Sequence, residues 1–203
     1  VGARPLLAAV FDRAVEADAE ELIVVIGYEG AQIVDHFGDS YNRVPITYVH
    51  QRERLGLGHA VLQTAPHVTG PFLIVNGDNV FSDSLRPVVE SVARDGVDGV
   101  IGVEPVSREM ARQTGVVDRD DGVVTRIVEK PTDPPSTLVT TGCYVLPEDV
   151  FKACALVRPS AEGEYQLSEA VSLLARAGYT IETVPVGERV NVNRPSDIER
   201  AAA

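Results

Sequence analysis

The sequence lacks the features of several large classes of protein. It has no tryptophan, two cysteines, and no apolar run long enough to span a membrane. Cys143 and Cys154 do not have the spacing of a metal site or a redox motif, so we expect two small buried hydrophobic residues and no disulfide. No segment resembles a secretory signal peptide, which favours a cytoplasmic protein.

Positive charge is also scarce. Thirty acidic residues face eighteen basic ones, which gives a net charge of -12, and the only lysines are Lys130 and Lys152. A nucleic acid partner is therefore not expected, because its phosphates would repel the chain. An acidic surface almost free of lysine is typical of proteins from a high-salt cytoplasm, where screening weakens self-repulsion. The alternative is an acidic protein from an ordinary cytoplasm.

The length of 203 residues fits one domain with a sizeable core. In the first half, apolar β-branched runs alternate with helical patterns and short loops, which predicts β–α–β units and a parallel, doubly wound sheet. In the second half, Asp118–Gly122 separates two β-type runs, which predicts a hairpin. The expected helices are 5–18, 31–37, 59–64, 83–94, 148–156 and 165–176; the expected strands are 22–26, 45–49, 72–75, 99–103, 115–117, 123–129, 138–146, 179–184 and 190–192.

The apolar run Phe72–Val75 follows Gly70-Pro71 and ends abruptly in Asn76-Gly77-Asp78-Asn79. Such a run predicts a strand buried on both faces of a parallel sheet. Ligands of open α/β sheets bind beyond the carboxyl ends of the strands, where a carboxylate can hold a divalent cation against phosphate oxygens. Gly77 would let the backbone approach such a ligand closely. Alternatively, Asp78 only caps a turn.

Eight short motifs, taken in order, resemble the sugar-1-phosphate nucleotidylyltransferases, and in particular haloarchaeal UTP–glucose-1-phosphate uridylyltransferases and glucose-1-phosphate thymidylyltransferases. The motifs are GARPLL at Gly2, VVIGY at Val24, Gln51…Gly56, NGDN at Asn76, GVV at Gly115, EKP at Glu129, TTGCY at Thr140 and GEYQLSEA at Gly163. The resemblance covers essentially the whole chain. It implies a Rossmann-like α/β fold with a mostly parallel mixed sheet of the nucleotide-diphospho-sugar transferase type.

The same resemblance implies a reaction. A nucleoside triphosphate, UTP or dTTP, combines with a sugar-1-phosphate such as glucose-1-phosphate to give a nucleotide sugar and pyrophosphate, with Mg²⁺ as cofactor. The attacking phosphate is mostly dianionic at neutral pH, because its second pKa is about 6, so no general base is needed. The protein must align two anions and neutralise the charge that develops between them.

Site residues follow by matching positions to the motifs. Asp78 and Asn191 match metal positions, and Asp78 and Lys130 match catalytic ones. The expected nucleotide-binding residues are Gln51, Gly56 and Gly77; the expected sugar-phosphate-binding residues are Gly115, Glu129, Lys130, Thr141 and Tyr144. The single domain 1–203 would then comprise a nucleotide-binding half, 1–104, and a sugar-phosphate-binding half, 105–203. Without the resemblance, Gln51–Gly56 is an ordinary loop and Lys130 a solvated hairpin end.

Three departures from the family pattern predict that the chain is weakly active or inactive. The opening strand and the Gly-rich phosphate loop are absent from this sequence, and that strand would lie centrally and leave two neighbours with unpaired edges. Asn191 replaces a metal-binding Asp, and Glu162 replaces an Arg near the sugar phosphate. The sequence is either a truncated version of a longer protein or a decayed paralogue.

Two other functions stay open at this point. One is a non-catalytic nucleotide-sugar-binding subunit, which would associate with an active paralogue; a homo-oligomer is also possible. The other is a glycosyltransferase, but its D-x-D metal motif would need an acid at Asn76.

Overall fold

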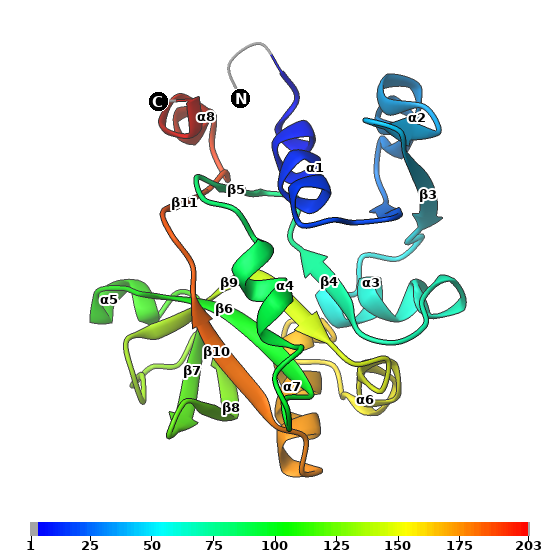
Figure 1. Ribbon diagram of the computed structural model, residues 1–203. Helices are drawn as coiled ribbons and strands as arrows, with labels where there is room; N and C mark the ends of the chain where they lie inside the picture. Colours follow the sequence, from blue (N-terminus) through cyan, green and yellow to red (C-terminus); the bar gives the residue numbers. More distant parts are fainter. Residues whose placement is uncertain (1–3, 203) are drawn as a thin grey trace.

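Three β-sheets and the helices that pack on them form the computed structural model, which describes residues 4–202 apart from the side chains of Pro195, Ala201 and Ala202 (Figure 1). The helices are α1 (Leu6–Glu16), α2 (Gly30–Phe37), α3 (Leu57–Gln63), η1 (Ala65–His67), α4 (Arg86–Ser91), α5 (Arg108–Ala111), α6 (Val150–Leu156), α7 (Leu167–Arg176) and α8 (Pro195–Ala202). The strands are β1 (Leu22–Ile26), β2 (Ser40–Tyr41), β3 (Val44–His50), β4 (Phe72–Val75), β5 (Asn79–Phe81), β6 (Gly99–Pro105), β7 (Gly115–Asp120), β8 (Val123–Glu129), β9 (Leu138–Leu146), β10 (Ile181–Pro185) and β11 (Arg189–Asn191). Gly2 and Ala3 of the GARPLL motif lie outside the described residues.

The largest sheet has the order β4-β9-β6-β10-β8-β7, with a further pairing of β9 with β7. The expected α/β architecture with a mixed sheet is confirmed. Among the described strands, however, only β1–β3 and β6–β10 pair in parallel, while β9 runs antiparallel to both β4 and β6. This corrects the expectation of a mostly parallel sheet. Strands β7, β8 and β9 follow one another without a helix, and strands joined without a crossover helix pair antiparallel.

Strand β4 also differs from its prediction. It is half-buried along its whole length and pairs only with β9 among the described residues, so it lies at the edge of its sheet and not at the centre. Strand β1 pairs only with β3 among these residues. Strand β1 is thus at the edge of the three-stranded sheet, as β4 is at the edge of the six-stranded one.

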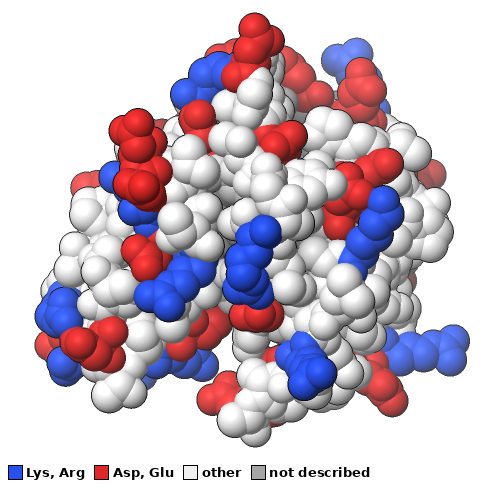
Figure 2. Space-filling model, turned by 90° about the horizontal axis from the view of Figure 1, so that it is seen from below, with Lys and Arg blue, Asp and Glu red and all other residues white. Residues whose placement is uncertain are grey.

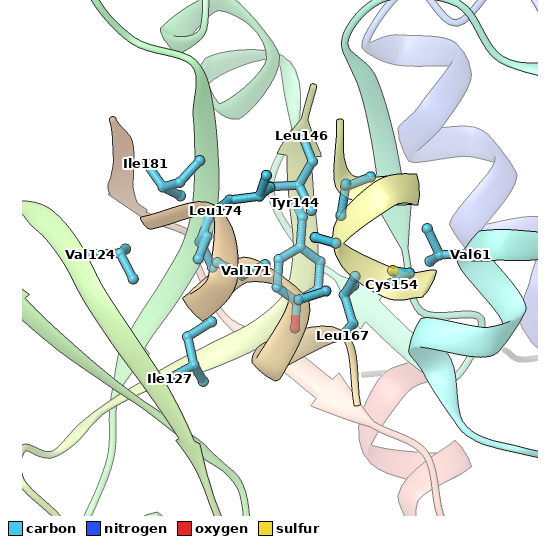
Figure 3. Packing of buried hydrophobic residues seen from close by; sticks show 14 of the residues in the cluster. Val61, Val124, Ile127, Tyr144, Leu146, Cys154, Leu167, Val171, Leu174 and Ile181 are labelled. Atoms are coloured by element: carbon cyan, nitrogen blue, oxygen red, sulfur yellow. The ribbon is translucent and has the colours of Figure 1, made fainter. Parts of the chain in front are cut away.

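The main hydrophobic core lies between the six-stranded sheet and helices α3, α6 and α7 (Figure 3). The ring of Tyr144, from β9, points in among Leu167 and Val171 of α7, and Cys154 of α6 belongs to the same cluster. Cys143 and Cys154 are free and buried, as predicted, and burial raises the pKa of each thiol to about 12.

The smallest of the three sheets has two strands, β5 and β11. Strands β5 and β11 pair antiparallel, with Asn79 opposite Asn191, and α1 packs beside β5, where the Arg13 side chain donates to the Phe81 carbonyl at 3.1 Å. In the described part of the chain, no helix is both long enough and apolar enough to cross a membrane.

Candidate active site

The turn Asn76–Asp78 leaves the carboxyl end of β4 and holds two side-chain oxygens without partners. Asp78 Oδ1 and Asn76 Oδ1 are both buried, and neither has a hydrogen-bond partner. Buried polar atoms in native proteins are normally hydrogen-bonded, so an unpartnered carboxylate oxygen and an amide oxygen in one turn indicate a ligand position. The Val192 amide donates to the Asp78 carbonyl at 2.8 Å, which brings the segment after Asn191 against this turn.

Gly142, in the TTGCY motif, supports the same turn from β9. Its φ is +74°, and its carbonyl accepts a hydrogen bond from the Asn76 amide at 2.8 Å. A Cβ at this position would lie 2.5 Å from Asn79 Nδ2 and 2.8 Å from Asn76 Nδ2. A residue with a side chain would displace both asparagines, so glycine is required here on two separate grounds.

Behind the turn, a polar network joins three strands. Arg189 NH1 donates to Asn79 Oδ1 at 2.6 Å, and Asn191 Nδ2 donates to the same oxygen at 3.0 Å. The other guanidinium nitrogens of Arg189 contact Glu104 Oε1 at 2.7 and 2.9 Å. Arg189, Glu104 and Asn79 were not predicted as site residues from the sequence, because each is tied to the site by pairings between segments far apart in the chain.

The expected nucleotide-binding loop lies at the carboxyl ends of β1 and β3. The Gln51 amide donates to the Ile26 carbonyl at 2.8 Å, and its side chain donates to the Gly56 carbonyl at 3.1 Å. Gly56 has a φ of +93°, and a Cβ there would lie 2.8 Å from the Tyr165 carbonyl oxygen. The Tyr165 amide donates to the Leu55 carbonyl at 2.7 Å, so the GEYQ segment holds this loop in place.

Three of the expected sugar-phosphate residues, Gly115, Glu129 and Lys130, lie at one end of the hairpin of β7 and β8. Gly115 pairs with Glu129, and a Cβ on Gly115 would lie 3.0 Å from Glu129 Oε1 and 3.2 Å from Thr140 Oγ1. A groove of about 620 Å³ between β8 and α7 adjoins Glu129. Lys130 Nζ lies 3.7 Å from Glu162 Oε2, and both side chains are mostly exposed.

The other two expected residues, Thr141 and Tyr144, are on β9. Thr141 is fully buried and donates its hydroxyl to the Gly102 carbonyl at 2.8 Å. Tyr144 is 4 % exposed, and burial raises the pKa of its phenol to about 12. The structure therefore places both side chains in the interior. The Thr140 hydroxyl, which was not predicted as part of the site, lies with the Glu129 carboxylate beside Gly115.

The unpartnered oxygens of Asp78 and Asn76 fit a divalent cation. The described residues contain no group of three or more His, Cys, Asp or Glu that could hold a metal ion by themselves. One carboxylate oxygen and one amide oxygen without partners are the hard ligands that Mg²⁺ accepts, and Mg²⁺ commonly completes its coordination with waters and substrate phosphates. Gly77, between the two, is exposed.

A comparison with protein families decides the class. The Nucleotidyl transferase family matches residues 1–187 of this chain. The chain belongs to that family. It is a nucleotidyltransferase, as the resemblance implied.

Two relatives of this nucleotidyltransferase come from the haloarchaeon Haloferax volcanii. This chain is 43 % identical over 203 residues to the UTP–glucose-1-phosphate uridylyltransferase AglF, and the match covers 99 % of this chain and 84 % of AglF. It is 32 % identical to the low-salt glycan biosynthesis nucleotidyltransferase Agl11, covering 99 % of this chain but only 57 % of Agl11. The acidic, lysine-poor composition agrees with these haloarchaeal relatives.

The solved structures give the same fold. A UDP-glucose pyrophosphorylase complexed with UDP-glucose superposes with a TM-score of 0.86 and 25 % sequence identity, over 98 % of this nucleotidyltransferase and 85 % of that chain.

Proposed function

We propose that this chain transfers a uridylyl group from UTP to glucose-1-phosphate and releases pyrophosphate. The identity to AglF over 84 % of that enzyme supports the choice of nucleotide and sugar. The observation that carries the proposal is the buried Asp78 oxygen, which has no partner and lies at the carboxyl end of β4, beside the segment that follows Asn191.

The reaction needs positioning and charge neutralisation more than proton transfer. An oxygen of the sugar phosphate forms a bond to the α-phosphorus of UTP, while the bond from that phosphorus to the bridging oxygen breaks and pyrophosphate leaves with the electron pair. Because the attacking phosphate is already mostly dianionic at neutral pH, no side chain must take its proton. The residues of the chain therefore act by holding two anions in line.

Asp78, with the amide oxygens of Asn76 and Asn191, would hold the Mg²⁺. When bound, this ion neutralises the negative charge that develops on the phosphate oxygens. Lys130 would contact the sugar phosphate as a point charge, because an ammonium group binds phosphate without a fixed orientation. Glu129 would accept hydrogen bonds from sugar hydroxyls, and the absence of a side chain at Gly115 lets its carboxylate lie close to the backbone of β7.

Gln51, Gly56 and Gly77 form the proposed nucleotide-binding set, in the half 1–104. At Gly77 the absence of a side chain would let the nucleotide lie against the backbone, whereas at Gly56 it lets the loop pack against Tyr165. Gly115, Glu129, Lys130 and Thr140 form the sugar-phosphate set in the half 105–203, with the buried Thr141 and Tyr144 in supporting positions.

We also propose that turnover is low. The Glu162 carboxylate beside Lys130 competes with a phosphate for the same ammonium group. Asn191 contributes an uncharged oxygen at a position where a carboxylate would bind Mg²⁺ more strongly.

The test is to incubate the full chain with UTP, glucose-1-phosphate and Mg²⁺ in concentrated KCl, with dTTP in a parallel reaction. Mass spectrometry then measures UDP-glucose, and a coupled assay measures pyrophosphate. We expect both products in equal amounts, and more of them with UTP than with dTTP. No product from either nucleotide would contradict the proposal, and calorimetric binding of UDP-glucose in that case would support a non-catalytic binding subunit instead.

A further inference from the structure

The Arg189 side chain contacts two residues of the polar network, Asn79 and Glu104, with a geometry that fixes an amide orientation. Its guanidinium donates to Asn79 Oδ1 at 2.6 Å and pairs with Glu104 Oε1 at 2.7 Å. The side chains of Arg189 and Glu104 are only 12 % and 23 % exposed. Their pairing is thus shielded from solvent, where charge-assisted hydrogen bonds are strong and directional.

Asn79 is the link between Arg189 and the site. It is 1 % exposed, and its Oδ1 accepts from both Arg189 and Asn191. An amide oxygen has two lone pairs, so these two donors saturate it. The Asn79 nitrogen consequently faces Gly142, where a Cβ would lie 2.5 Å away. Rotation of this amide by 180° would place its NH₂ group against the guanidinium, with two donors facing each other.

The orientation of Asn79 determines that of Asn191. Because Asn191 donates its nitrogen to Asn79 Oδ1, its own Oδ1 is turned away from Asn79, and there it accepts from the Asn193 side chain. An amide oxygen can bind a cation, whereas an amide nitrogen cannot. The Asn191 side chain can therefore serve as a cation ligand in only one of its two amide orientations.

We propose that Arg189 is a positioning residue: it holds the Asn79 amide so that Asn191 keeps its nitrogen on Asn79. The Asn191 oxygen is then available, in exchange for its contact with Asn193, to a cation bound at Asp78. This inference deepens the proposed function and rests on it. Arginine suits the task because its planar fork donates to two acceptors at fixed angles, while a lysine at this position would keep the charge but not the fork. Arg189 itself needs no contact with substrate.

The test compares Arg189→Lys in two backgrounds, the native chain and an Asn191→Asp variant. In the native background we expect Arg189→Lys to lower kcat about 10–100-fold, the range typical of residues that orient metal ligands, with little change in KM for UTP. A carboxylate has two equivalent oxygens and needs no amide orientation. In the Asn191→Asp background the loss caused by Arg189→Lys should therefore shrink to about 3-fold or less, as a double-mutant cycle measures.

A second readout does not depend on turnover. Titration with Mn²⁺ in the presence of UDP-glucose, followed by electron paramagnetic resonance, should show weaker Mn²⁺ binding for Arg189→Lys, by about 10-fold. Urea unfolding of each variant identifies a loss of fold. An equal loss of kcat and of Mn²⁺ binding in both backgrounds, or no loss in either, would overturn the inference. If the native chain forms no product, the proposed function fails, while the Mn²⁺ titrations still decide the role of Arg189.

Discussion

At the scale of single residues, Gly142 is the position at which the site depends most directly on one missing side chain. Its positive φ and its closeness to Asn76 and Asn79 are separate constraints, so one substitution tests both. A suitable control is Gly122 in the hairpin turn, which has a φ of +85° but where a Cβ would meet no atom within 4 Å.

We predict that Gly142→Ala lowers the free energy of unfolding by about 2–4 kcal/mol, through left-handed backbone strain and the displacement of the two asparagines. Gly122→Ala should cost only the strain, about 1–2 kcal/mol. Urea unfolding measures both changes. Gly142→Ala should also abolish most of the pyrophosphate release, whereas Gly122→Ala should not. Equal losses of stability for the two variants would contradict the role assigned to Gly142.

Glu162 is the second residue with a specific expected effect. Its carboxylate lies 3.7 Å from Lys130 Nζ. We predict that Glu162→Gln lowers KM for glucose-1-phosphate about 2–5-fold, the range for an exposed ion pair, because Lys130 is then free to bind phosphate. The control is Glu169→Gln, which removes the same charge from an exposed pair with Arg176. A similar change of KM in both variants would mean that net charge, and not the Lys130 contact, is responsible.

At the scale of elements, α1 packs its apolar face against the three-stranded sheet and also contacts that sheet through the polar side chain of Asp12. Asp12 accepts from the Tyr41 hydroxyl at 2.7 Å and pairs with Arg4 at 2.9 Å. Burial acts to raise the pKa of Asp12, but the hydrogen bonds from Arg4 and Tyr41 outweigh it, and the net pKa is lowered.

This lowered pKa predicts a pH dependence. A carboxyl whose pKa is lower in the folded state contributes stability above its unfolded pKa, about 3.9, and loses it as the pH falls through the folded value. We therefore expect Asp12→Asn to be less stable than the native chain at pH 7, by about 1 kcal/mol. The difference should shrink below pH 4. Urea unfolding at a series of pH values measures it, and a difference that stays constant to pH 3 would contradict the role given to Asp12.

Most elements could be predicted from the sequence because their patterns are local. The strands Leu22–Ile26 and Leu138–Leu146 were predicted with the bounds that the structure has, and the hairpin around Asp118–Gly122 is confirmed. The direction of pairing could not be predicted in the same way. Strand β9 lies between β4 and β6 and runs against both, and nothing in the periodicity of Leu138–Leu146 specifies its neighbours.

The candidate site shows the same limit. Asp78 was found from its place after an apolar run, and Gln51 and Gly56 from the resemblance. No strand was predicted at 79–81, however, so the pairing of Asn79 with Asn191 was not foreseen. The contacts of Arg189 with Asn79 and Glu104 span 110 and 85 residues of sequence and depend on that pairing.

At the scale of the whole molecule, the excess of acidic residues is the dominant property. Figure 2 shows acidic and basic side chains interspersed over one face, so short-range pairs offset part of the repulsion there. The net charge of -12 still opposes folding at low ionic strength.

We predict that the melting temperature rises as KCl increases, because the Debye length falls from about 10 Å at 0.1 M to about 3 Å at 1 M and screens this repulsion. Calorimetry in a KCl series measures the shift. A melting temperature that falls over the series would show that exposed ion pairs, which salt weakens, matter more than net charge.

The central claim is that Asp78, at the end of β4, serves the transfer of a uridylyl group. The most direct measurement is the rate of pyrophosphate release from UTP and glucose-1-phosphate by the native chain, Asp78→Asn and Asp95→Asn. Asp95 is exposed and provides a control with the same change of charge. We predict a loss on the order of 10²–10³-fold for Asp78→Asn and no loss for Asp95→Asn. Release by Asp78→Asn at the native rate would contradict the claim.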